Sequence, residues 1–267
     1  MKRKPAVAGQ FYQASSSQLS IQVNQYIEKE TPKEHAIGIV SPHAGLMYSG
    51  EVAGSVYSRI EIPHTFILLG PNHTGAGAPV SIMSSGQWQL PTGEMTIDES
   101  LASDLMKGTD ILTEDSLAHS MEHSLEVQLP FILHYSSSVK IVPIIMMTDS
   151  LQVCSTLGKA IADAVSNADY AVTIIASSDM SHYVSDAVAR TTDKKAIEEI
   201  LALDPEGLYN TVRQESITMC GVIPVTTMLY AARLLGANDS TLIKYMTSGE
   251  VSGDLDYVVG YAGLIIR

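Results

Sequence analysis

The chain has few cysteines and few charged residues, and each shortage excludes a class of protein. Two of its 267 residues are cysteine, so no disulfide framework supports the fold, and the reducing cytoplasm is the expected location. Charged residues make up 17% and hydrophobic residues 45%, a mixture that excludes intrinsic disorder. Apolar runs stay well short of the roughly 20 residues that span a membrane, and no secretion signal is recognisable. A membrane is therefore not an expected partner.

Basic residues are also scarce. The chain has 16 Lys and Arg against 29 Asp and Glu, which gives a formal net charge of −13. Because nucleic-acid binding depends on basic side chains that neutralise phosphates, nucleic acid is not an expected partner. The glycine-rich phosphate-binding patterns and the Gly-x-Ser-x-Gly turn of many hydrolases are also missing. Nucleotide binding and serine hydrolysis thus have no support in the sequence.

Short apolar runs alternate with amphipathic stretches along the whole chain. The runs are typical of strands covered on both faces, and they comprise residues 36–40, 65–69, 139–146, 170–176 and 257–266. Helical periodicity extends over residues 19–28, 151–165, 187–203 and 222–235, and residues 81–108 are expected to form a hairpin or an excursion from the sheet. This alternation predicts an α/β sandwich with a central, mainly parallel or mixed sheet flanked by helices. Without a linker or repeat to divide them, residues 1–267 are expected to form a single domain.

Histidines follow three of the predicted strands. His43, His73 and His182 come shortly after strand ends, where open α/β sheets place their ligand crevices. If the three strands are neighbours, the three side chains share one crevice. The alternative for His43 and His73 is a loop histidine that is hydrogen-bonded to backbone. Asp179 lies three residues before His182, so it could orient the imidazole. Asp179 or Ser181 could also cap a helix that begins there, and the two interpretations are compatible.

A second group of ionisable residues lies in the middle of the chain. On a helix, His119 and His123 would share one face, and Glu122 and Glu126 would share the adjoining one. The spacing resembles a metal-binding pair but lacks the His-Glu-x-x-His order of zinc proteases. The alternative is the solvated start of an ordinary helix.

Cys220 stands directly before the predicted helix 222–235. Helix N-termini lower the pKa of a thiol, and the resulting thiolate can bind a metal or attack an electrophile. The alternative, a small buried hydrophobic residue, fits Cys154 better. Two histidines with one anionic ligand suit Fe(II), and a thiolate as the anion suits iron, copper or zinc. The same residue types would also permit a hydrolase with a cysteine nucleophile.

Six segments, in this order along the chain, carry a family resemblance. They comprise residues 5–12, 42–45 with 48–50, 69–73, 122–130, 177–183 and 219–221. Together they resemble the Memo family, also called AmmeMemoRadiSam system protein B, over almost the whole length. The resemblance implies a fold similar to that of the class III extradiol dioxygenases, which are non-haem iron enzymes.

The resemblance also implies a metal pocket. His43 and His73 would match two histidine ligands of iron or copper, with zinc as a further candidate. Cys220 would stand where the dioxygenases have a carboxylate ligand. Because a thiolate is softer and itself oxidisable, ring cleavage is less expected than fold similarity alone would suggest.

Further residues of the pocket and the partners follow from the same resemblance. His182 with Asp179 would match the acid/base histidine and its neighbour, and His123 would line the pocket. Prokaryotic members are associated with a radical-SAM protein and an AMMECR-like protein. The expected function is therefore a redox or oxygen-dependent metal protein that acts on an unidentified small molecule. The alternative is a partner-binding scaffold whose pocket is vestigial.

Overall fold

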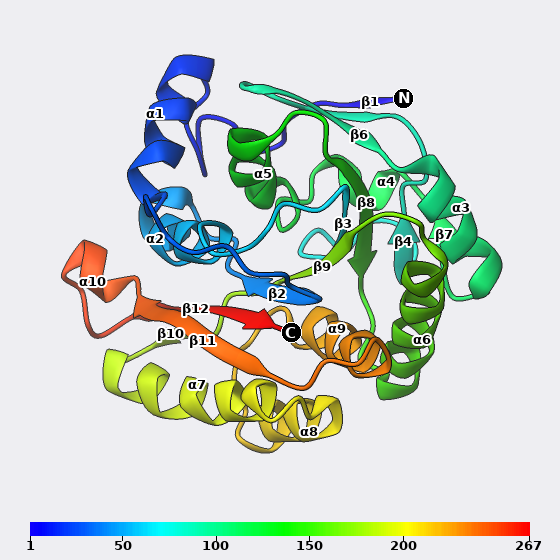
Figure 1. The fold of residues 1–267 in the computed structure, drawn as a ribbon. Helices are drawn as coiled ribbons and strands as arrows, with labels where there is room; N and C mark the ends of the chain where they lie inside the picture. Colours follow the sequence, from blue (N-terminus) through cyan, green and yellow to red (C-terminus); the bar gives the residue numbers. More distant parts are fainter.

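Parallel strands form the centre of a twelve-stranded mixed sheet. β2, β9, β3 and β8 pair in parallel in that spatial order, and antiparallel pairs extend the sheet beyond them. The computed structural model describes residues 1–267 and confirms the predicted α/β fold with a mixed sheet between helices (Figure 1). The strands are β1 (Lys2–Arg3), β2 (Gly38–Ser41), β3 (Thr65–Pro71), β4 (Val80–Ile82), β5 (Gln87–Leu90), β6 (Gly93–Ile97), β7 (Thr113–Glu114), β8 (Lys140–Met146), β9 (Val172–Ser177), β10 (His182–Val184), β11 (Ser240–Thr247) and β12 (Val258–Ile266).

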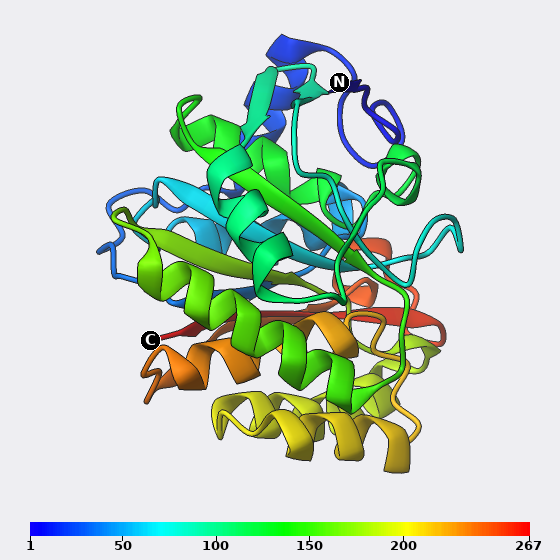
Figure 2. The same ribbon diagram turned by 90° about the vertical axis from the view of Figure 1, so that its right-hand side faces the viewer.

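Helices cover both faces of this sheet. α1, α2 and α5 lie together on one side, whereas α6 and α9 contact each other on the other side (Figures 1 and 2). The helices are α1 (Ser16–Tyr26), α2 (Leu46–Tyr57), α3 (Glu99–Gly108), α4 (Leu117–Ser120), the 3₁₀ turn η1 (Glu126–Gln128), α5 (Leu129–Tyr135), α6 (Leu151–Asn167), α7 (Asp186–Leu201), α8 (Pro205–Gln214), α9 (Val222–Leu234) and α10 (Gly249–Ser252).

Each central strand is apolar on both faces because each contributes to two cores. In β3, Ile67 and Leu69 belong to the larger core on the α6 and α9 side, whereas Phe66 and Leu68 belong to the core beneath α1, α2 and α5. Side chains alternate between the faces of a strand, so burial on both faces gives the continuous apolar runs that the sequence shows. All seven residues of β3 are buried.

The predicted segments correspond to real elements with small shifts at their ends. The five predicted strands match β2, β3, β8, β9 and β12, and the four helices match α1, α6, α7 and α9. The irregular stretch contains an antiparallel hairpin, in which β5 pairs with β6. Helices α2, α5 and α8 and strand β11 lie outside the predicted segments, and α3 occupies the end of residues 81–108, where no helix was predicted. No helix combines the length and apolar composition that a membrane crossing requires.

The crossing of α1 and α2 depends on a glycine and yields a stability prediction. A Cβ atom on Gly54 would lie 2.2 Å from the carbonyl oxygen of Tyr26, which is backbone and cannot rotate away. Overpacking of this kind costs about 1–3 kcal/mol, so Gly54→Ala is expected to lower the free energy of unfolding in urea by that amount. The matched control is Gly108→Ala, whose Cβ would meet Ala160 at an ordinary 3.8 Å. Equal unfolding midpoints for the two variants would contradict this account of the crossing.

Candidate metal centre

The three strands that end in predicted site residues are direct neighbours. β9 lies between β2 and β3, and all three run parallel. Their carboxyl ends therefore meet at one edge of the sheet, where His43, His73 and Asp179 follow β2, β3 and β9. The condition on which the sequence-based crevice depended is thus met.

His43 is held by its Nδ1 atom. The ring is 1% exposed, and Nδ1 lies 2.9 Å from the hydroxyl oxygen of Ser177. That hydroxyl donates its one hydrogen to the carbonyl of Ser124 and accepts a hydrogen bond from Gln128 Nε2. Because the Ser177 hydrogen is already used, His43 Nδ1–H must be the donor to Ser177. The lone pair of His43 therefore sits on Nε2, the atom that a metal would meet.

His73 is held in the same way by a carboxylate. Its Nδ1 lies 2.9 Å from Glu122 Oε1, and its backbone N–H donates to Glu122 Oε2 at 2.5 Å. Burial alone would raise the pKa of Glu122, but hydrogen bonds from the His73 side chain and from the backbone N–H groups of Ser124 and His73 outweigh it and lower the pKa to about 2. The ionised Glu122 accepts the Nδ1–H of His73 and leaves Nε2 free. In many metal sites a carboxylate accepts the second ring N–H of a histidine ligand and so fixes the orientation of the ring.

His123 joins the other two imidazoles. Its ring stacks on His73 with centroids 4.7 Å apart and meets His43 edge-on at 5.6 Å. One nitrogen from each of the three rings lies within 4.8 Å of the others. Two nitrogens bound to one ion at about 2.1 Å each can be at most about 4.2 Å apart, so a slight contraction would bring all three onto one ion.

Cys220 lies against this group. Its Sγ is 3.2 Å from His43 Nε2 and accepts the backbone N–H of Asp179 at 3.3 Å. The position of Cys220 before α9 predicted a lowered thiol pKa, and this prediction is wrong. Burial, reinforced by the charge of Asp179, raises the pKa of Cys220. A bound cation would reverse this effect, because a coordinating thiol is deprotonated outright.

Asp179 lies in the loop after β9, and His182 is the first residue of β10. Asp179 is not a helix cap, because α7 begins at Asp186 and is capped by Ser185. Its Oδ1 instead accepts the backbone N–H groups of His43 and Ala44 at 2.8 and 3.3 Å. Burial raises the pKa of Asp179, and the hydrogen bonds from the backbone N–H groups of His43 and Ala44 oppose this shift. His182 donates Nδ1–H to the carbonyl of Thr218 at 2.8 Å, so its lone pair is also on Nε2.

Residues 119–126 do not form the helix that the pairing of His119 with His123 would require. α4 ends at Ser120, so His119 and His123 do not share a helix face. The reading as a solvated helix start is also wrong, because Glu122 and Glu126 are 1% and 0% exposed. The structure thus shows a role for Glu122 that the sequence analysis missed. A buried carboxylate that accepts backbone and imidazole N–H groups leaves no pattern in the local sequence.

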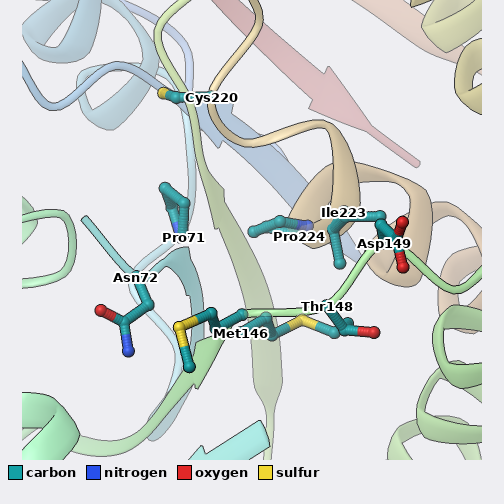
Figure 3. A pocket seen from close by; sticks show the side chains of 9 residues that line it. Pro71, Asn72, Met146, Thr148, Asp149, Cys220, Ile223 and Pro224 are labelled. Carbon is teal, nitrogen blue, oxygen red and sulfur yellow. The ribbon is translucent and has the colours of Figure 1, made fainter. Parts of the chain in front are cut away.

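A cavity of about 440 Å³ opens beside Cys220. Figure 3 shows Cys220 at one end, Pro71 and Asn72 on one wall, and the start of α9 opposite. The lining is Pro71, Asn72, Met146, Met147, Thr148, Asp149, Cys220, Ile223 and Pro224. Most of these side chains are apolar or uncharged, as is typical of small-molecule sites.

Comparison with known proteins defines the family. A family model described as Memo-like protein matches residues 3–265. A MEMO1 family protein from Methanopyrus kandleri is 39% identical, with 100% of this chain and 99% of the relative covered. Another from Pyrobaculum aerophilum is 42% identical, with 98% of each chain covered. The chain belongs to the Memo family, as the sequence resemblance predicted.

One solved structure supports the fold. An uncharacterized protein from Escherichia coli K12 superposes with a TM-score of 0.57 at 12% identity, over 85% of this chain and 98% of that one. At this identity, the likeness extends to the arrangement of helices and strands.

The hydrogen-bond pattern at His43 gives a prediction that needs no metal. Burial and the neighbouring histidines lower the pKa of His43 well below its ordinary value, so the ring is neutral at pH 7. Nitrogen-15 NMR of the metal-free protein should show His43 protonated at Nδ1, and Ser177→Ala should weaken that preference because it removes the acceptor. A wild-type ring protonated at Nε2 would contradict the assignment.

Proposed function

We propose that this protein binds a redox-active transition metal, iron or copper, with His43 and His73 as ligands and Cys220 as the anionic donor. The proposal is supported above all by the two imidazoles, each of which is fixed at Nδ1 and keeps Nε2 available. Imidazole suits iron, copper and zinc, and thiolate favours soft ions such as Cu(I) and zinc. When bound, an ion of this kind supplies Lewis acidity and, for iron or copper, one-electron redox chemistry.

The other residues of the site could bind a small molecule beside the metal ion and transfer protons to or from it. The cavity beside Cys220 would hold the molecule next to the ligand set. His182 carries its lone pair on Nε2 and would accept or return a proton there. Asp179 fixes the backbone of His43 by accepting its N–H. His123 would line the same space, and it lies close enough to join the ligands.

The 3.2 Å contact between Cys220 Sγ and His43 Nε2 also resembles a cysteine–histidine nucleophile pair. Such pairs act as thiolate and imidazolium. Here burial raises the pKa of Cys220 and lowers that of His43, so both groups stay neutral. The site therefore favours metal binding over cysteine hydrolysis.

A second candidate function is partner binding. Tyr183, Leu255 and Tyr257 are 75%, 55% and 71% exposed. Tyr183 lies in β10, and the other two directly precede its partner strand β12. Exposed apolar groups of this kind are typical of interaction surfaces. The family resemblance suggests a radical-SAM protein and an AMMECR-like protein as partners. If the pocket is vestigial, a His43→Ala/His73→Ala double variant would still capture them.

Metal content tests the main proposal. Anaerobic loading with Fe(II) or Cu(I), followed by desalting and elemental analysis, should give about one ion per wild-type chain. His43→Ala and His73→Ala should each lose most of it, because each removes a fixed nitrogen donor. His134→Ala is the control, since His134 is exposed and outside the group. Equal metal content in all four proteins would refute the proposed site.

The identity of the third donor has its own test. Charge transfer from a thiolate gives a strong near-ultraviolet band in the Co(II)-loaded protein. Cys220→Ser should abolish the band and weaken Cu(I) binding at least tenfold, whereas His123→Ala should keep the band. Loss of metal in His123→Ala, with full binding in Cys220→Ser, would instead make the three histidines the ligand set.

A further inference from the structure

The N-terminal segment, residues 3–12, converges on one buried carboxylate. Glu126 is 0% exposed and accepts four hydrogen bonds from this segment. The donors are Arg3 Nη1 at 2.6 Å, the backbone N–H groups of Ala6 and Val7 at 2.8 and 3.1 Å, and the hydroxyl of Tyr12 at 2.5 Å. Because an unpaired buried carboxylate is very unfavourable, the segment and the loop that carries Glu126 are fixed to each other.

Arg3 extends this attachment to the residues behind the metal centre. Its guanidinium is buried and lies over the ring of Trp88 at 4.0 Å. Nε donates to the carbonyl of His119, and Nη2 donates to the carbonyl of Glu122, each at 2.6 Å. The side chain of the same Glu122 holds His73 and accepts the backbone N–H of His123 at 2.9 Å. Glu122 is thus the single residue that connects Arg3 to both His73 and His123.

Phe11 brings the segment into contact with the site itself. Its ring lies 4.7 Å from the ring of His123 at an angle of 57°. Its carbonyl accepts the backbone N–H of Leu46 at 2.7 Å, at the start of the helix that follows His43. One short segment therefore touches the loops that carry His43 and His123, although these loops are far apart in the sequence.

We propose that residues 3–12 form a strap that positions the donors of the metal centre, with Phe11 and Arg3 as its positioning residues. Phe11 limits the orientations of the His123 ring, and Arg3 fixes the loop that carries Glu122. The strap would set how tightly and in what geometry the ion is held, beyond its contribution to folding. This inference rests on the proposed metal binding. Substitution of residues that hydrogen-bond to metal ligands commonly weakens metal binding by about 10- to 100-fold.

Co(II) binding to the full-length protein tests the strap. Phe11→Leu keeps an apolar side chain but removes the ring beside His123, and Arg3→Lys keeps the charge but loses the planar fork of donors. Arg3→Lys, which acts through Glu122 on the ligand His73, is expected to bind Co(II) about tenfold or more weakly and to shift its visible d–d bands. Phe11→Leu, which acts on His123 beside the ligands, is expected to shift the d–d bands. The control is Phe66→Leu, a buried substitution in β3, which should lower the urea midpoint and leave Co(II) affinity and spectrum unchanged.

The outcomes separate the strap from the site that it serves. If the wild-type protein binds no Co(II), the proposed function fails. If it binds Co(II), and both strap variants bind with unchanged affinity and spectrum, the strap is structural only and this inference is refuted. If Phe11→Leu does not fold, Arg3→Lys decides the question by the same two readouts.

Discussion

The parallel pairing of β3, β9 and β2 is the constraint on which the site depends. Their register sets Leu69 opposite Ala176 and Ser41 opposite Ser177, so the chain leaves all three strands at the same edge. A register shift of one residue in any of these strands would move its histidine or aspartate away from the other site residues. It would also turn the side chains of that strand to the opposite face of the sheet. The two apolar cores on either side of these strands hold the register. Folding and site assembly therefore depend on the same contacts.

Hydrogen-bond acceptors at Nδ1 orient the imidazoles of His43 and His73 so that they can act as metal ligands. A serine hydroxyl holds His43, and a carboxylate holds His73. In both cases the hydrogen bond at Nδ1 decides which nitrogen keeps its lone pair. Cys220 completes the arrangement with a thiol that burial keeps protonated until a cation is present. The lone pairs of His43 and His73 are set on Nε2 before an ion binds, so the two imidazoles need little reorganisation, whereas the thiol must give up its proton.

Much of the fold could be predicted because buried parallel strands leave continuous apolar runs in the sequence. Helix α2 escaped prediction for a related reason. Nine of its residues are buried, including two glycines and two serines, so it shows no clear apolar stripe. The pairing of His119 with His123 assumed a helix through residues 119–126 on the basis of spacing alone. Arg3 occupies the carbonyls of His119 and Glu122, which a helix would need for its own hydrogen bonds. A contact across more than a hundred residues leaves no local signal.

The site was predicted in part. His43, His73, Asp179 and Cys220 lie together, as expected from strand ends and family motifs, whereas the supporting role of Glu122 and the direction of the Cys220 pKa required the three-dimensional environment. X-ray absorption at the metal edge of the loaded protein tests the central claim most directly. The account predicts imidazole scattering together with one sulfur at about 2.3 Å. A shell of oxygen ligands without imidazole or sulfur would contradict it.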